Sequence, residues 1–189
     1  MKLTLPRLIV AITFLGIFSL SVRLLREADT WWHLRTGQWI VEHRAIPAAD
    51  PFSHTRAGAD WRIPGWIAQV PMFWLYDRFG YAGLNLFTAF FVTVAFAFVY
   101  ASCTGPPILR AFALLLAAAS AGIYWAPRPQ IVSFALAGAF AYVLHTYRWN
   151  GVNRLWLLPP LMAFWANAHG GFAIGFVLMV LTLAGQVVS

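Results

Sequence analysis

Charged residues and cysteine are both scarce in this sequence. Only 10% of its 189 residues are Asp, Glu, Lys or Arg, whereas a soluble domain carries about a quarter. The one cysteine, Cys103, excludes a disulfide within the chain and a zinc site built on paired thiolates. In place of charge, 61% of the residues are hydrophobic and 17% are aromatic, and the mean hydropathy is +0.69. This composition excludes a soluble globular domain and predicts a membrane protein.

Acidic residues are absent from every long apolar run. All six lie between residues 27 and 77: Glu27, Asp29, Glu42, Asp50, Asp60 and Asp77. Six arginines between residues 26 and 78 balance them, so the net charge of +7 comes from basic residues elsewhere: Lys2, Arg7, Arg23, Arg110, Arg128, Arg148 and Arg154. Because little solvent-exposed surface remains to carry these charges, they do not indicate a nucleic-acid partner. A transporter half is also disfavoured, since no predicted span holds an acidic residue to bind a coupling ion.

Apolar runs separated by charges, prolines and glycines predict about six transmembrane helices in an all-α polytopic membrane protein. A span needs about 20 mostly apolar residues. The predicted spans cover residues 3–25, 81–103, 108–125 and 130–147, and the uncharged run 155–189 divides near 167–171 into a fifth and a sixth. No small-x-small cleavage pattern follows the first run, which favours an uncleaved span over a secretory signal peptide.

These spans divide the chain into three parts. Residues 1–25 form the first transmembrane helix, residues 26–80 a long outer (periplasmic) loop with amphipathic and interfacial helices, and residues 81–189 a five-helix transmembrane bundle. Five of the seven uncompensated basic residues fall at the N-terminus and in the connections after the second and fourth spans. Since cytoplasmic loops are enriched in Lys and Arg, the N-terminus is predicted to be cytoplasmic. Arg128 is then one of two such cations on the outer side.

The long outer loop begins with a predicted amphipathic helix over residues 31–43. Asp29 or Thr30 fits its N-cap position. Asp29 and His33 fall one helical turn apart, and a carboxylate and an imidazole so placed are suited to bind a divalent metal or to remove a proton. Spacing alone favours a structural interpretation, in which Asp29 caps the helix, His33 is solvated and Trp31 and Trp32 form an interfacial aromatic belt.

The rest of the outer loop offers further polar candidates. Asp50 and His54 lie in a proline-containing turn, where they either contribute to a site or belong to an ordinary surface turn. The stretch 66–76 is apolar but short, so it is predicted to lie in the membrane interface or to re-enter the membrane. A loop of this length, rich in Trp, His and Asp, exceeds what a connection needs.

Two outer connections between spans also carry polar residues. Arg128, between Pro127 and Pro129 and followed by Gln130, is suited to bind a phosphate through two parallel hydrogen bonds, or else to anchor a helix end to lipid phosphate. Asn167 and His169 end an outward-going span beside two glycines, which allow close backbone approach. Asn167 either lines a site or holds helices together.

Three stretches of the sequence carry a family resemblance. Residues 29–37 (DTWWHLRTG) are similar to the acidic-aromatic signature in the first outer loop of oligosaccharyltransferase catalytic subunits. Together with residues 50–53 (DPFS) and 165–171 (WANAHGG), they look more like a bacterial branch of GT-C-like proteins. The order of spans and loop elements likewise resembles the front half of the GT-C superfamily of membrane glycosyltransferases. This resemblance implies a location in the bacterial inner membrane.

The resemblance implies sugar transfer on the outer face, from a polyprenyl-phosphate sugar to a lipid, glycan or protein acceptor. Asp29 would be the catalytic carboxylate, which either removes the proton of the acceptor or holds a divalent cation (Mg²⁺ or Mn²⁺), and Asp50 would be a second acidic contributor. Topology, rather than a family motif, places Arg128 and His169 at the donor phosphate. The supporting residues would be His33, His54, Gln130 and Asn167.

A second interpretation is a non-catalytic accessory or structural transmembrane subunit of a larger membrane complex, for example a photosynthetic or respiratory one, derived from a GT-C fold. Ten Trp and sixteen Phe residues suit packing against partner helices. The later spans and the outer C-terminal domain of the family have no counterpart in these 189 residues. The chain is therefore expected to be the front part, or a truncated relative, of a larger protein. Its expected partners are membrane lipids, a polyprenyl-phosphate substrate and other membrane subunits.

Overall fold

The computed structural model of the protein describes residues 4–25, 27–62 and 64–188. Within these ranges the chain is helical and contains no β-strand, which confirms the predicted all-α class. The α-helices are α1 (Leu5–Ser21), α2 (Asp29–His43), α3 (Trp66–Ser102), α4 (Pro107–Ala121), α5 (Gln130–Asn150), α6 (Leu158–Ala168) and α7 (Ala173–Val188). Short 3-10 helices are η1 (Gly122–Tyr124), η2 (Leu155–Leu157) and η3 (Gly170–Phe172).

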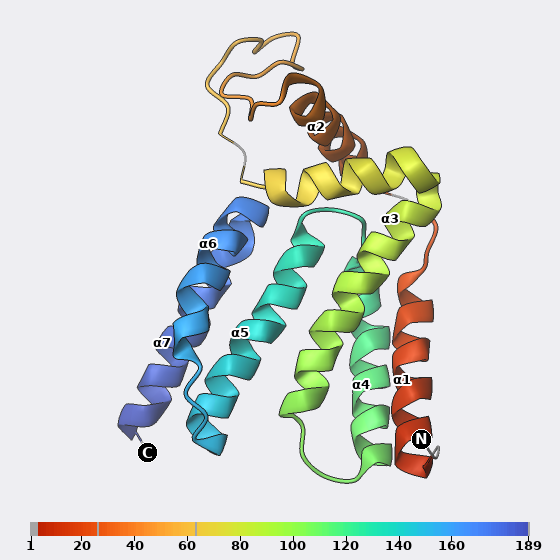
Figure 1. The fold of residues 1–189 in the computed structure, drawn as a ribbon, viewed down its shortest axis with the longest axis vertical. Helices are drawn as coiled ribbons and strands as arrows, with labels where there is room; N and C mark the ends of the chain where they lie inside the picture. Colours follow the sequence, from red (N-terminus) through yellow and green to blue (C-terminus); the bar gives the residue numbers. More distant parts are fainter. Residues whose placement is uncertain (1–3, 26, 63, 189) are drawn as a thin grey trace.

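Four helical segments of the described chain are long and apolar enough to cross a membrane. They are Trp66–Ser102, Pro107–Tyr124, Gln130–Asn150 and Gly170–Val187. α1 is apolar but has only 17 residues, and α6 has 11, so the predicted number of six spans stays a prediction. Apart from α2 and the first half of α3, the helices run between two ends of a bundle (Figure 1), and α1 begins and α7 ends at the end opposite α2.

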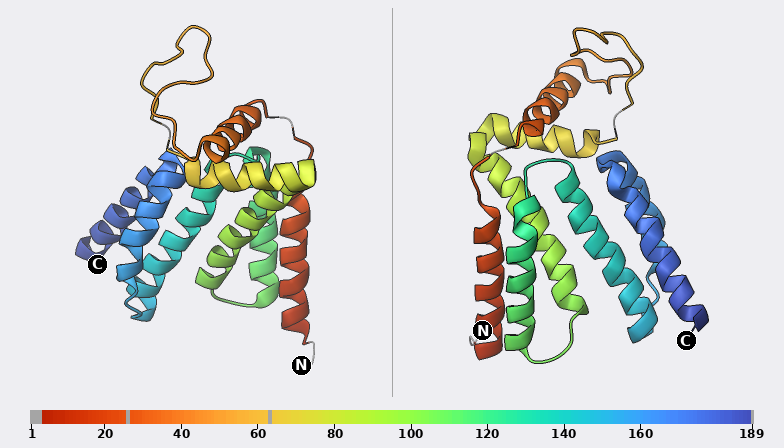
Figure 2. Two further views of the ribbon diagram at one scale, coloured as in Figure 1. Left: turned by 45° about the horizontal axis from the view of Figure 1, so that its top comes forward. Right: turned by 180° about the vertical axis from the view of Figure 1, so that it is seen from behind.

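α3 turns sharply at Gly80, where its backbone leaves the helical conformation (φ 57°, ψ −138°). A residue with a side chain rarely adopts such a positive φ, so glycine suits this position. A Cβ at Gly83 would overlap the Leu75 carbonyl, which shows how tightly the two halves fold against each other. The first half of α3 lies across the end of the bundle and the second half descends into it (Figures 1 and 2). The predicted interfacial stretch 66–76 lies in this first half.

α2 packs onto the first half of α3 and forms a layer outside the bundle (Figure 2). A Cβ at Gly37 would overlap the backbone of Gln69, so glycine is what allows the two helices to touch. Leu34, Thr36 and Ile40 of α2 are buried, whereas His43 at its end is exposed. α2 ends at His43, and the C-cap residue Arg44 adopts the left-handed conformation (φ 52°).

The bundle is held together by close packing rather than by apolar burial alone, because lipid tails are as apolar as leucine side chains. At the α3–α5 contact, a Cβ on Gly138 would lie 3.1 Å from the Ala95 carbonyl oxygen. Trp165 of α6 and Phe140 of α5 are fully buried with ring centroids 5.4 Å apart. These contacts fix α5 and α6 relative to α3, and so fix the connections that carry Arg128 and His169.

Candidate functional site

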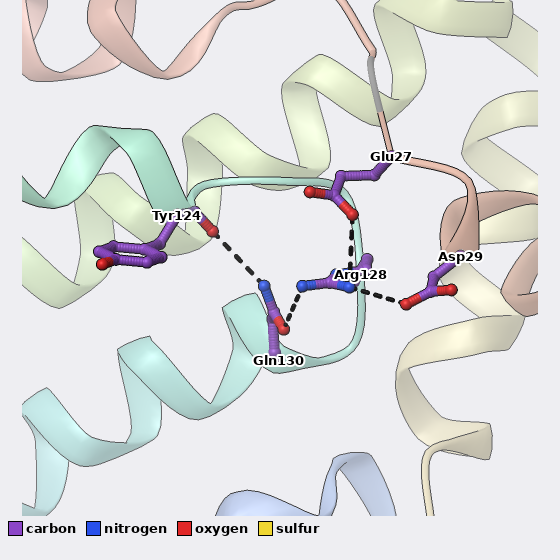
Figure 3. Close-up of polar contacts among 5 residues, drawn as sticks. All are labelled: Glu27, Asp29, Tyr124, Arg128 and Gln130. Atoms are coloured by element: carbon purple, nitrogen blue, oxygen red, sulfur yellow. Dashed lines mark hydrogen bonds and ion pairs between the residues drawn. The ribbon is translucent and has the colours of Figure 1, made fainter.

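The α2 end of the bundle gathers opposite charges around Arg128. Its Nη1 donates a hydrogen bond to Asp29 Oδ2 at 2.8 Å and lies 3.4 Å from Glu27 Oε2. Its Nη2 donates to Gln130 Oε1 at 2.8 Å, and Gln130 Nε2 donates in turn to the Tyr124 carbonyl (Figure 3). Two carboxylates from one side and an amide from the other therefore converge on one guanidinium.

Local sequence explains why these groups meet. The ring of each proline beside Arg128 fixes that proline's own φ at about −65°, which stiffens the connection between η1 and α5. The Arg128 amide also donates a hydrogen bond to the Ala126 carbonyl at 2.8 Å. Asp29 is the first residue of α2, and Ala28 holds the N-cap position, so neither Asp29 nor Thr30 is the N-cap that the sequence predicted. A carboxylate in the first turn is still favourable by roughly 0.3–1 kcal/mol, because the helix dipole is positive there.

Arg128 is more sheltered than the acids that hold it. Its side chain is 23% exposed, against 57% for Asp29 and 46% for Glu27. Ion pairs of this exposure contribute only about 0–1 kcal/mol, because water competes for both partners. The Arg128 Nε is buried and has no hydrogen-bond partner among the described residues. The guanidinium is thus held weakly enough to exchange partners.

His33 lies one turn after Asp29 and is uncharged near neutral pH. Burial of the side chain lowers the pKa of His33 from 6.5 to about 4. The nearby Asp29 carboxylate acts to raise this pKa, whereas Arg128 and His169 lower it further. Its Nδ1 lies 3.1 Å from Gln69 Nε2 of α3. Gln69 is 1% exposed and its Oε1 has no hydrogen-bond partner among the described residues. A buried polar atom of this kind points to a water or ligand at the site.

His169, between α6 and η3, is fixed in one neutral form by a hydrogen-bond network. Trp165 Nε1 donates to Ser133 Oγ at 2.6 Å, so the Ser133 hydroxyl proton is free to be donated to His169 Nδ1 at 2.8 Å. The Gly171 amide donates to the same Nδ1 at 3.0 Å. Because Nδ1 accepts both bonds, Nε2 carries the proton. Burial, followed by the charge of Arg128, lowers the pKa of His169, which agrees with a neutral imidazole.

Five of the sequence candidates thus come together at one end of the bundle. Asp29 and Gln130 both accept hydrogen bonds from Arg128, and the charges of Asp29, Arg128 and His169 act on His33. They come from α2, from the η1–α5 connection and the start of α5, and from the α6–η3 corner.

Other contributors to this cluster were missed by sequence reasoning. Glu27 carried a weak signal, its position two residues before Asp29. Gln69 and Ser133 carried none, because their contacts depend on how α3 and α5 pack.

The remaining candidates have other contacts. The Asp50 carboxylate accepts hydrogen bonds from the amides of Phe52 and Ser53; the Ser53 side chain, then these amides, lower the pKa of Asp50. His54 is exposed in the same loop. Asn167 Oδ1 accepts a bond from Trp66 Nε1 at 3.1 Å, which ties α6 to the start of α3.

The residues that the structure describes contain no group of three or more His, Cys, Asp and Glu side chains placed to hold a metal ion. Glu27 and Asp29 form a pair of carboxylates that share the Arg128 Nη1, at 3.4 and 2.8 Å respectively.

A polar pocket adjoins the Arg128 cluster, which consists of Arg128 and its partners Glu27, Asp29 and Gln130. It has a volume of about 690 Å³ and lies between the end of α1, the second half of α3 and the η1–α5 connection. Its polar lining includes Arg23, Glu27, Asn85 and Thr88, and the rest is largely apolar, with Trp125 adding an aromatic ring. Glu27 therefore faces this pocket and also contacts Arg128.

Comparisons with protein-family models, with curated proteins and with solved structures find no match to this chain.

Proposed function

We propose that the protein is a membrane glycosyltransferase of the GT-C type that transfers a sugar from a polyprenyl-phosphate donor on the outer face of a bacterial inner membrane. The observation that supports this most is the 2.8 Å contact between Asp29 and Arg128 at the α2 end of the bundle. A carboxylate that accepts a proton and a cation that binds a phosphate are the two groups that transfer from a phosphate-linked sugar needs. Two uncharged imidazoles beside them supply further hydrogen-bond donors.

The same proposal includes the orientation of the chain. α1 and α6, although short, cross the membrane with the four longer segments, which gives six spans and a cytoplasmic N-terminus. The basic residues support this, because Arg110 lies in the first turn of α4, Arg148 in the last turn of α5 and Arg154 between α5 and η2, all at the end opposite α2. The Arg128 cluster then faces the periplasm. A cysteine placed at Gly58, in the loop after α2, is expected to react with a membrane-impermeant maleimide in intact spheroplasts.

In the proposed reaction, Asp29 takes the proton of an acceptor hydroxyl while that oxygen bonds to the anomeric carbon of the sugar. The bond between this carbon and the phosphate oxygen breaks, and the polyprenyl phosphate leaves with the bonding electrons. Arg128 exchanges a carboxylate for the phosphate and stabilises its growing charge, with His169 donating through Nε2. Asp29 is 57% exposed, so its proton passes to water afterwards. The polar pocket beside Glu27 receives the acceptor.

A divalent cation fits this site as a companion of the donor. Mg²⁺ is commonly held by one or two carboxylates together with substrate phosphates and water, and Glu27 and Asp29 form such a pair. In the alternative role of Asp29, as a metal ligand instead of the base, these two residues would hold Mg²⁺ or Mn²⁺, which would supply positive charge to the leaving phosphate. If so, treatment with EDTA lowers transfer and added Mn²⁺ restores it.

The alternative of an accessory subunit draws on one observation. The span that includes η3 and α7 is only 6% buried, and exposed apolar residues such as Phe176 and Leu181 lie along it. Further helices pack there if the chain belongs to a complex. Copurification in fixed stoichiometry with other subunits, unaffected by Asp29→Ala, is the result that favours this alternative.

The proposed function is tested by sugar transfer in proteoliposomes that contain the full chain, a panel of radiolabelled polyprenyl-phosphate hexoses and a membrane extract as acceptor. Asp29→Asn is expected to lower the rate by about 10²–10⁴-fold, the usual contribution of a general base. Asp60→Asn is the matched control, since Asp60 is exposed and pairs only with Arg62 among the described residues. Asp50→Asn tests the second acidic residue. Equal rates for wild type and Asp29→Asn would refute the proposal.

A further inference from the structure

An apolar cavity lies beneath the first half of α3. Its volume is about 800 Å³, which is within the range of cavities that bind small molecules. Twelve of its thirteen lining residues are apolar, Thr93 being the exception, and five of them are phenylalanines. The walls come from both halves of α3, from α5 and α6, and from Phe18 of α1. A site with this lining suits a hydrocarbon chain and offers no partner for a charged group.

The cavity opens sideways, at the depth of the apolar helices. Three of its lining residues have large exposed fractions: Leu86 48%, Phe90 59% and Phe164 43%. They belong to the second half of α3 and to α6, which form walls of the cavity. In a membrane, hydrocarbon surrounds the apolar lengths of these helices. A lipid chain therefore enters the cavity without crossing a polar surface.

One end of the cavity meets the polar cluster described above. Ala68, Val132 and Phe164 line the cavity. Their immediate neighbours are Gln69, which bonds to His33, Ser133, which bonds to His169, and Trp165, which donates a hydrogen bond to Ser133. Such a pair of neighbours, one lining the cavity and one in the hydrogen-bond network, is found on each of α3, α5 and α6. The charge of Arg128 reaches both histidines. An apolar chain in the cavity thus has its head at a set of N–H donors and one guanidinium.

We propose that this cavity binds the isoprenoid chain of a polyprenyl phosphate, with the phosphate at Arg128 and His169. The inference rests on the proposed function and adds to it the place of the lipid chain. A polyprenyl phosphate has one hydrocarbon chain for each phosphate group, whereas a bulk glycerophospholipid has two chains. Because a single apolar cavity meets a single phosphate-binding cluster here, the site suits a lipid with one chain. Thr93, whose buried Oγ1 has no hydrogen-bond partner among the described residues, is the one polar group along the chain's path.

Photo-cross-linking tests the placement of the chain. The full-length protein, carrying Phe90→benzoylphenylalanine or Phe164→benzoylphenylalanine, is reconstituted in phosphatidylethanolamine nanodiscs and irradiated with radiolabelled undecaprenyl phosphate. Phe112→benzoylphenylalanine is the control, because Phe112 is 67% exposed on α4 and does not line the cavity. We expect at least tenfold more capture at positions 90 and 164, abolished by unlabelled undecaprenyl phosphate but not by phosphatidylglycerol. Equal capture at position 112, or competition by phosphatidylglycerol, would overturn the proposal.

A second variant pair fills the cavity. Val94→Trp places a large ring inside it, and Val99→Trp places the same ring on the exposed side of the same helix. Only Val94→Trp is expected to lower undecaprenyl phosphate binding, measured by native mass spectrometry, by about tenfold or more, and equal binding contradicts the placement. Because the probe has no sugar, the outcomes are separable. Specific capture without sugar transfer refutes the proposed function alone, and transfer without capture refutes the cavity assignment alone.

Discussion

Arg128 and Arg110 mark opposite ends of the bundle and are held in different ways. Arg110, in the first turn of α4, lies over the Tyr100 ring at 3.7 Å and donates from Nη2 to the Tyr100 carbonyl near the end of α3. Arg128 is held by two carboxylates that water also reaches. Each Nε is buried without a hydrogen-bond partner among the described residues. The first arrangement locks two helices together, whereas the second leaves a cation that a phosphate can take over.

The largest difference between the two arginines is expected in sugar transfer. Arg128→Gln removes the cation that stabilises the leaving phosphate, and a preorganised charge of this kind contributes about 10²–10³ in rate. The measurement is the initial rate of transfer in proteoliposomes. Arg110→Gln is the control and is expected to stay within about threefold of wild type once rates are corrected for folded protein, because it is distant from the cluster. A similar loss of transfer rate in both variants would contradict the proposed difference between the two arginines.

The next largest effect is expected from the contact that seats α2 on the Arg128 end. Gly37→Ala forces a methyl group into the Gln69 backbone, and overpacking of this kind costs about 1–3 kcal/mol. Thermal unfolding in detergent measures the loss of stability. The rate of sugar transfer should fall as well, because Asp29 and His33 belong to α2. Gly185→Ala is the matched control, since a Cβ on this α7 residue meets no atom within 4 Å. Equal stability of both variants would contradict the packing described.

A smaller effect is expected on the stability of the folded protein, which should differ between variants at the two ends of the bundle. Arg110→Gln loses a bond to a helix-end carbonyl and a cation–π contact, together worth about 1–2 kcal/mol. Arg128→Gln loses only half-exposed ion pairs, worth about 0–1 kcal/mol. Thermal unfolding of the two variants should therefore rank Arg110→Gln as the less stable. The reverse order would mean that Arg128 is the structural lock.

The last difference between the two ends is a pH dependence of stability that is confined to the α2 end. Between about pH 6.5 and about pH 4 the unfolded chain binds a proton at His33 that the folded chain does not. Stability from the neutral histidine is thus complete above pH 6.5 and falls as the pH is lowered through this window. His33→Gln should flatten the dependence of the unfolding temperature on pH, and His54→Gln, on an exposed residue, should not. Parallel curves for wild type and His33→Gln would contradict a buried neutral His33.

The contrast between the ends also shows what the sequence could predict. The gaps between charges located the long apolar helices, because a charge in lipid is costly wherever it falls. The turn at Gly80 and the contact of Asp29 with Arg128 lie at the ends of such gaps, so a common location for Asp29, Arg128 and His169 was predictable. Gln69 and Ser133 were not, because α3 and α5 bring them to the histidines by packing between distant segments. Glu27 carried only the weak signal of its position two residues before Asp29.

The most direct test of this account is a nitrogen-to-phosphorus distance measurement by solid-state NMR. The full chain, labelled at the arginine guanidinium nitrogens, is reconstituted with undecaprenyl phosphate, and Arg128→Gln and Arg110→Gln assign the signals. We predict a short contact between phosphate and guanidinium that disappears in Arg128→Gln and persists in Arg110→Gln. A contact that survives Arg128→Gln, or the lack of any contact in the wild-type chain, would contradict the assignment of Arg128 as the phosphate-binding residue.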